Sequence, residues 1–147
     1  LLDEIARFHQ KVAHLFDNGR TATEVLLDFS TLYIDFFLSD RELFRILMNF
    51  MLHNGSMDFT DDTDKRIILE TNKAISVTER IFRYGIDKGE FFIKEQEVIS
   101  MRNALWGLLN GVLSLHLFTG RESMREERIR ENIKRGLGVF IEGLKKS

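Results

Sequence analysis

ERIFRYGIDKGEFF, residues 79–92, and MRNALWGLLNGVLSLHLFTG, residues 101–120, decide how this chain folds. The first stretch predicts a helix that ends at one of two closely spaced glycines, Gly85 or Gly89. The second stretch is apolar on nearly every side, whereas a helix on the surface of a lone domain has one apolar stripe. We therefore expect this second helix to be covered from more than one direction, by a large core or by a second chain.

Helical spacing continues along the rest of the chain. Apolar residues step by three and four positions, which marks one face of a helix, in six segments: 1–16, 25–37, 43–51, 67–82, 95–118 and 129–144. The first segment ends near Asn18-Gly19, and the acids between Asp58 and Asp64 suit the positive end of the fourth helix. Capping boxes precede three segments, at Thr21–Glu24, Ser39–Glu42 and Ser123–Glu126. No segment alternates like a strand, so we expect one all-α domain, residues 1–147, of about six helices.

Composition excludes several classes of protein. The chain has no cysteine, no proline and a net charge of −2, which disfavours Cys-based metal sites and a basic nucleic-acid surface. The opening residues LLDEIARF lack the apolar region of a signal peptide. The longest apolar run, Ala104–Phe118, is shorter than the roughly 20 residues that span a bilayer. We expect a cytoplasmic protein that does not enter a membrane.

The usual motifs of enzymes and metalloproteins are missing from the sequence. The four histidines, His9, His14, His53 and His116, are not four residues apart, and no glutamate has a histidine three residues later. The pair Gly107 and Gly111 lies in mid-helix, where it suits close helix approach rather than a phosphate loop. No serine sits in a nucleophile elbow. We therefore predict no metal, no cofactor and no enzymatic activity.

An unusual aromatic content, with 13 phenylalanines, is interspersed with a few polar residues. One interpretation is a packed core whose polar groups are satisfied internally. The other is an apolar cavity with a few orienting hydrogen-bond partners, which is how small-molecule pockets are built. The candidate ligand-binding residues are Tyr33, Phe37, Phe50, His53, Asn72, Ile75, Trp106, Asn110 and Leu113.

Two helices carry more apolar surface than one core requires. The helix through Trp106 has a second apolar face, and the last helix adds a flatter face with Gly136 and Gly143. Two such helices from each of two chains would form a four-helix interface, so we predict a homodimer. The candidate interface residues are Leu105, Leu108, Val112, Leu115, Ile133, Leu137, Phe140, Ile141 and Leu144.

Three stretches resemble the C-terminal regulatory domain of TetR/AcrR-type repressors. They are Ile81 with Gly85–Phe91, Ala104–Gly111, and Ser39–Arg45, which is similar to the link between that family's fifth and sixth helices. The resemblance implies a helical domain that dimerises through its last two helices and binds a small apolar or amphipathic effector. It also implies a DNA-binding helix-turn-helix of about 45 to 50 residues, which is absent before Leu1. Operator DNA is then expected to bind through that missing domain alone.

Three hypotheses follow from these patterns. The first is a ligand-sensing, dimerising domain of a transcriptional repressor, in which the effector changes the spacing of the DNA-binding heads. The second is a helical protein-interaction module with a solid core and no ligand. The third, a small helical enzyme, has little support because no catalytic motif is present.

Overall fold

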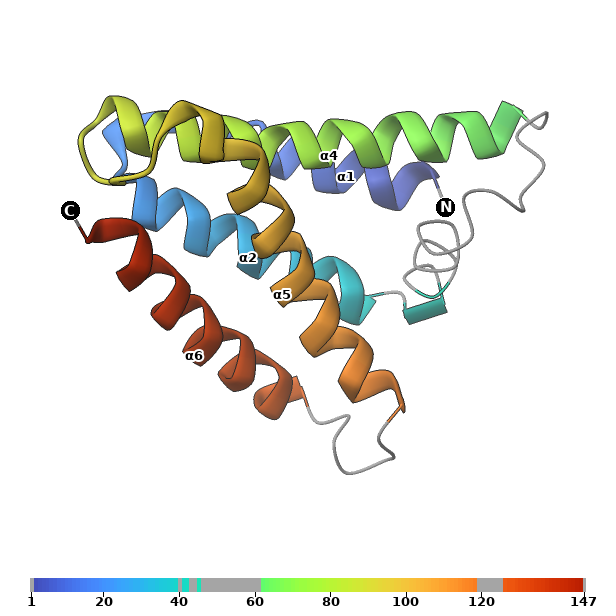
Figure 1. The fold of residues 1–147 in the computed structure, drawn as a ribbon. Helices are drawn as coiled ribbons and strands as arrows, with labels where there is room; N and C mark the ends of the chain where they lie inside the picture. Colours follow the sequence, from blue (N-terminus) through green and yellow to red (C-terminus); the bar gives the residue numbers. More distant parts are fainter. Residues whose placement is uncertain (1, 40, 43–44, 46–61, 119–125, 147) are drawn as a thin grey trace.

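The structure is a computed structural model that describes residues 2–39, 41–42, 45, 62–118 and 126–146 (Figure 1). Within these residues the fold is all-helical, as predicted. The α-helices are α1 (Leu2–Val12), α2 (Ala22–Ser39), α4 (Asp62–Asp87), α5 (Val98–Phe118) and α6 (Glu126–Lys145). Two short 3₁₀ helices, η1 (Asp17–Gly19) and η2 (Glu95–Glu97), precede α2 and α5. The helix expected at 43–51 and the capping box at 123–126 fall largely outside the described residues.

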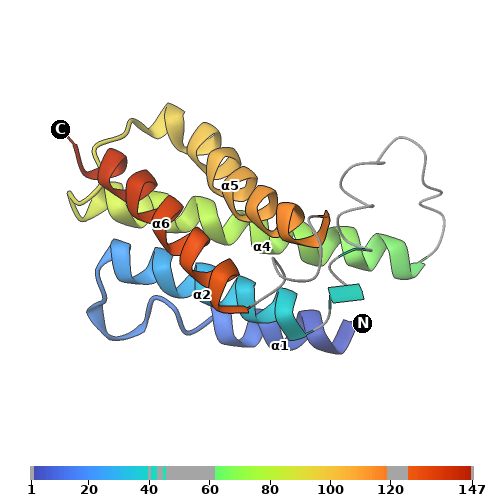
Figure 2. The same cartoon turned by 90° about the horizontal axis from the view of Figure 1, so that it is seen from below.

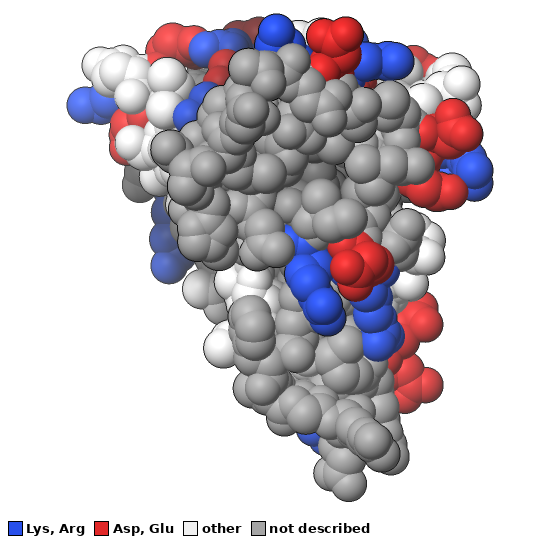
Figure 3. Space-filling model, turned by 90° about the vertical axis from the view of Figure 1, so that its right-hand side faces the viewer, with Lys and Arg blue, Asp and Glu red and all other residues white. Residues whose placement is uncertain are grey.

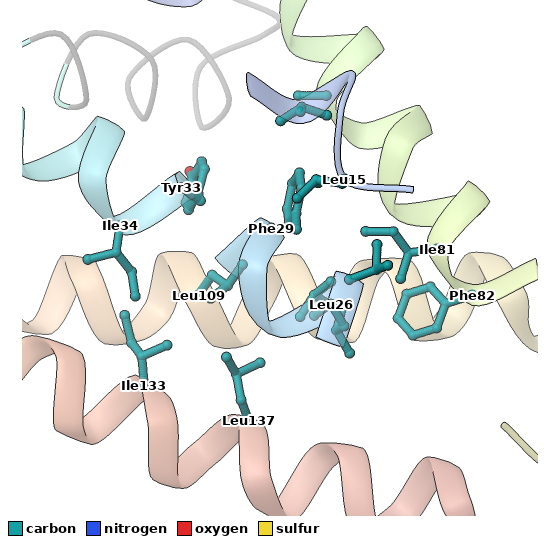
Figure 4. Close-up of a cluster of buried hydrophobic side chains, with 14 of the residues drawn as sticks. Leu15, Leu26, Phe29, Tyr33, Ile34, Ile81, Phe82, Leu109, Ile133 and Leu137 are labelled. Atoms are coloured by element: carbon teal, nitrogen blue, oxygen red, sulfur yellow. The ribbon is translucent and has the colours of Figure 1, made fainter. Parts of the chain in front are cut away.

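Helix α2 lies at the centre of the bundle. It packs against α1 and α4 on one side and against α6 on the other, while α5 packs against α4 and α6 (Figures 1 and 2). Its apolar residues are therefore buried on more than one side, including Leu26, Phe29, Ile34 and Phe37. Figure 4 shows α2 side chains meeting those of α4, α5 and α6 in this core. Among the helices of the described residues, none combines the length and apolarity needed to cross a membrane.

The start of α2 is held by two carboxylates. Thr21 and Glu24 form the predicted capping box, in which the Thr21 hydroxyl accepts from the Glu24 amide at 3.1 Å and the Glu24 carboxylate accepts from the Thr21 amide at 3.3 Å. Glu90, far along the chain, accepts the Ala22 amide at 2.8 Å and lies 3.4 Å from the Thr23 amide. A helix leaves its first amides without intrahelical partners, so Glu90 links the end of α4 to the beginning of α2.

Replacing Glu90 by alanine is expected to lower the free energy of unfolding by about 1–2 kcal/mol, because the two α2 amides lose their acceptor. Urea denaturation followed by circular dichroism measures this change. The matched control is Glu142→Ala on the exposed side of α6, which should alter stability by less than about 0.5 kcal/mol. Equal losses in the two variants would contradict the linking role of Glu90.

The turn after α4 explains the paired glycines. Gly89 has a φ of 72°, a left-handed conformation that favours glycine, and its amide donates to the Ile86 carbonyl at 3.0 Å. Gly85 lies inside α4, where a β-carbon would come within 2.0 Å of the Phe91 ring. The glycine therefore makes room for Phe91 to fold back onto α4. The sequence expectation that the helix ends at Gly85 or Gly89 is resolved in favour of Gly89.

One predicted boundary is wrong. The first helix ends at Val12 rather than near Asn18-Gly19, because the chain tightens into turns with i→i−3 bonds such as Leu15 to Val12. Ser39 lies in the last turn of α2, and its hydroxyl donates to the Phe36 carbonyl at 2.8 Å. The helix that it was expected to precede falls largely outside the described residues.

Candidate functional site

An apolar cavity lies among α1, α2, α4 and α5. Its free volume is about 40 Å³, enough for a few waters but far below the several hundred Å³ of typical ligand pockets. The cavity is partly open to the surface and its walls are almost entirely apolar. It is lined by Ile5, Phe8, His9, Tyr33, Phe36, Glu70, Thr71, Ala74, Ile75 and Trp106.

Aromatic rings form most of the cavity wall. Tyr33 meets Trp106 edge to face with centroids 4.9 Å apart, and Phe8 lies 5.5 Å from Phe36 and 6.4 Å from Tyr33. Such edge-to-face contacts fix the ring orientations beyond what burial alone supplies. The Tyr33–Trp106 contact joins the α2 side of the wall to its α5 side.

The polar part of the cavity is a contact between α1 and α4. The Nε2 atom of His9 lies 3.0 Å from the Glu70 carbonyl oxygen and 3.1 Å from its carboxylate Oε2. Lys73 donates to the other carboxylate oxygen, Oε1, at 3.0 Å. This hydrogen bond is the main cause that lowers the pKa of Glu70, so the carboxylate is ionised at neutral pH.

Two hydrogen bonds tie the cavity wall to α5 and α4. The Tyr33 hydroxyl donates to Oδ1 of the buried Asn110, and the Trp106 indole donates to the Thr78 hydroxyl at 3.1 Å. Both bonds satisfy polar groups that would otherwise be costly to bury. Trp106 brings α5 into the cavity wall, and Asn110 of the same helix supports the wall from behind Tyr33.

The predicted ligand-binding residues divide into three groups. Tyr33, Ile75 and Trp106 line the cavity, and Asn110 lies behind Tyr33. Phe37 and Leu113 are fully buried in the core, while Asn72 is exposed on α4, so none of these three lines the cavity. Phe50 and His53 lie outside the described residues.

Sequence reasoning missed the α1 side of the cavity. Phe8 belongs to the predicted apolar stripe of residues 1–16, His9 is one of four histidines whose spacing does not fit the helical two-histidine metal motif, and neither His9 nor Glu70 is among the predicted ligand-binding residues. His9 and Glu70 are 61 residues apart in the sequence. The apolar spacing within α1 and within α4 does not indicate that these two helices pack against each other. The position of His9 beside the apolar stripe of α1 is a signal for this contact in the sequence, but a weak one.

A second notable region is the outward side of α5 and α6. On α5 the exposed residues are Ile99, Ser100, Asn103, Ala104, Gly107, Gly111 and Leu115. The adjoining side of α6 presents Asn132, Gly136, Val139, Phe140 and Gly143, of which Gly136 and Phe140 are half-buried. We call these twelve residues the α5–α6 surface. None of them carries a charge.

Contacts between the helices show that this side of α6 adjoins α5. A β-carbon at Gly136 would lie 3.4 Å from the Leu108 side chain, and Asn132 contacts the buried His116 ring at 3.1 Å. The α5–α6 surface is therefore continuous across the two helices, which run side by side in Figures 1 and 2.

The predicted dimer residues need correction. Five of them are at most 4% exposed within one chain and so cannot form an outer face: Leu105, Ile133, Leu137, Ile141 and Leu144. Figure 4 shows Ile133 and Leu137 pointing from α6 into the core. The other four, Leu108, Val112, Leu115 and Phe140, are exposed or half-buried. The sequence correctly indicated the apolar stripes of the last two helices, α5 and α6. The stripe that packs in the chain's own core was, however, also predicted to contact the partner chain.

Within residues 2–39, 62–118 and 126–146, no three histidine, aspartate or glutamate side chains are placed to hold a metal ion. On the side seen in Figure 3, the described residues show lysine and arginine mixed with aspartate and glutamate. The described residues visible there do not gather into a one-sign patch of the kind that a nucleic-acid surface has.

Tyr33 provides a pH test of the buried wall. Burial raises the pKa of its hydroxyl above the ordinary value of 10.0, and the hydrogen bond to Asn110 offsets only part of this effect. A raised pKa in the folded state gives stability that is complete below pH 10 and is lost as the pH rises above 10.

We expect the free energy of unfolding to fall more steeply above pH 10 in the native chain than in Tyr33→Phe, by up to about 1.4 kcal/mol per pH unit. Urea denaturation between pH 9 and 11 measures both slopes, and the other titrating groups are common to the two proteins. Parallel pH profiles would show that Tyr33 is not held in its neutral form by burial.

The fold and its cavity define an all-α bundle with an apolar site among four helices. Comparison with protein-family models gave no match, and comparison with curated proteins gave none either. A solved structure described as a protein with unknown function from Rhodococcus sp. RHA1 is similar, with a TM-score of 0.73 and 14% sequence identity. The match covers 98% of this chain and 69% of that one. At this identity the likeness shows a shared fold alone.

Proposed function

We propose that this chain is the effector-binding, dimerising domain of a TetR-like transcriptional regulator. The observation that carries the proposal is the position of α5. One side of this helix contributes Trp106 to the cavity wall, and the opposite side is exposed and uncharged. Operator DNA is expected to bind through a helix-turn-helix domain outside residues 1–147.

The glycines of the α5–α6 surface support a second copy of the chain as its partner. Each glycine inside a helix costs about 1 kcal/mol relative to alanine. No atom of the described residues lies within 4 Å of a β-carbon built at Gly107, Gly111 or Gly143, so packing within the described part of the chain does not explain these glycines. Close approach of a partner's helices does, and α5 and α6 from two copies would form a four-helix interface.

Exposed apolar side chains support the same interface. Val139 is 77% exposed and Leu115 is 63% exposed within one chain. Both side chains belong to a surface without charged residues. Such a surface favours association with a second chain, because the centre of an obligate interface is apolar and poor in charges compared with ordinary protein surface.

The two hydrogen bonds behind the cavity offer a route from ligand to interface. A ligand that widens the cavity pushes on Tyr33 and Trp106, which are bonded to Asn110 and Thr78. Because Trp106 and Asn110 belong to α5, their displacement shifts the helix that bears the interface. A small shift of this kind would change the spacing of two DNA-binding heads.

Trp106 is the sole tryptophan of the sequence, so its fluorescence reports on the cavity wall. The test is to screen apolar and amphipathic compounds by Trp106 emission and by melting temperature. A ligand at 100 times its dissociation constant should stabilise the folded chain by about 2.7 kcal/mol. A compound that raises the melting temperature without changing the emission would place binding away from this cavity.

The small volume of the cavity favours a second candidate function, a helical interaction module with a solid core. A space of about 40 Å³ must widen before it accepts a drug-sized molecule. Under this alternative the chain still dimerises, but no compound changes the Trp106 emission.

A further inference from the structure

The cavity has a charge preference built into its wall. Glu70 is the one Asp, Glu, Lys or Arg side chain in its described lining. The carboxylate uses its two oxygens differently: Oε1 accepts from Lys73, and Oε2 faces His9 of α1. Oε2 is therefore the oxygen that a ligand in the cavity could reach by displacing His9.

The rest of the wall suits the same sign of ligand charge. The cavity is lined by the rings of Phe8, Tyr33, Phe36 and Trp106. Aromatic ring faces carry negative electrostatic potential and attract cations within about 6 Å. Ring faces turned towards the cavity would therefore favour the same sign of ligand charge as the Glu70 carboxylate does.

We propose that the cavity selects hydrophobic monocations, with an ammonium group on the Glu70 carboxylate and an apolar body among the rings of Phe8, Phe36 and Trp106. This inference rests on the proposed ligand-sensing function and deepens it by naming the charge of the effector. The ammonium group replaces His9 at Oε2, which releases a polar contact between α1 and α4 and lets the narrow cavity widen.

Anionic and neutral amphiphiles fit this wall less well. An anion would lie beside Glu70 without a lysine or arginine in the described lining to balance it. A neutral molecule would gain the apolar contacts alone. The expected order of affinity is therefore cation, then neutral molecule, then anion.

The experiment uses three probes with the same hydrocarbon chain: octylammonium, 1-octanol and octanoate at neutral pH. Each is titrated into the native chain, with Trp106 emission and calorimetry as readouts. We expect octylammonium to bind at least about tenfold more tightly than octanoate, because its ammonium group can form a charge-assisted hydrogen bond with Glu70 whereas the octanoate carboxylate is repelled by it.

Two matched variants assign the preference to one carboxylate. Glu70→Gln should weaken octylammonium binding about tenfold and leave 1-octanol within about twofold. Glu79→Gln is the control, since Glu79 lies on the same helix with a side-chain exposure of 22% against 21% for Glu70 but does not line the cavity. It should leave the affinity for all three probes unchanged.

The outcomes separate this inference from the proposed function. Octanoate binding as tightly as octylammonium, or Glu70→Gln leaving octylammonium binding intact, would overturn the cation preference while the ligand pocket stands. If none of the three probes changes the emission or releases heat at millimolar concentration, the ligand-sensing function fails and this inference fails with it.

Discussion

Gly85→Ala is expected to lower the free energy of unfolding by about 3 kcal/mol, the upper part of the range for overpacking a core. The added methyl group would lie 2.0 Å from Cδ2 of Phe91, and Phe91 is 2% exposed. The ring cannot move outward without leaving the core, and moving α4 would disturb the turn that places Glu90 at the start of α2. The substitution is therefore expected to disturb both the Phe91 packing and the Glu90 contact with α2.

Urea denaturation of Gly85→Ala checks this expectation, with Gly138→Ala on α6 as the matched control. Gly138 is exposed and nothing lies within 4 Å of its added β-carbon, so alanine there should stabilise the chain by about 1 kcal/mol. In a Phe91→Leu background the cost of Gly85→Ala should shrink, because the two residues are coupled. An unchanged cost in that background would contradict the role assigned to the Phe91 ring.

Val139→Glu is expected to raise the dissociation constant of the proposed homodimer at least about 100-fold. Val139 lies on the uncharged α5–α6 surface and is 77% exposed in one chain, so a glutamate is harmless to the monomer. In a two-fold interface, however, the change buries two like charges, which costs several kcal/mol. The variant should therefore retain its helical circular dichroism while it loses its partner.

Sedimentation velocity over a range of concentrations measures the effect. Leu69→Glu is the control, because Leu69 is an exposed apolar residue of similar kind, 55% exposed, on α4 outside the α5–α6 surface. That variant should sediment as the native chain does. Dissociation by Leu69→Glu, or an intact dimer with Val139→Glu, would place the interface elsewhere.

Much of the fold was predictable because helical periodicity is a local property. The stripe of Ile129, Ile133 and Leu137 indicated α6, and the Thr21–Glu24 pattern indicated the start of α2. The end of α1 was not predictable in the same way. Leu15 stays on the apolar spacing and is buried, yet it reaches the core from a turn rather than from a helix.

The candidate site was less predictable, because it depends on which faces of the helices pack against one another. A helix that is apolar all round, such as α5, does not reveal which side is inner. Leu105 is inside and Gly107 is outside, although their spacing allowed either arrangement. The cavity posed the same difficulty, since the contact between His9 and Glu70 arises only when α1 is placed beside α4.

The central claim is that two copies of this chain associate through the α5–α6 surface beside a ligand cavity. Its most direct test is the mass of the native chain by sedimentation equilibrium between about 0.1 and 10 µM, the range in which obligate dimers persist. The account predicts a particle of twice the 17.2 kDa chain mass throughout that range. A particle of 17.2 kDa at the highest concentration would contradict it.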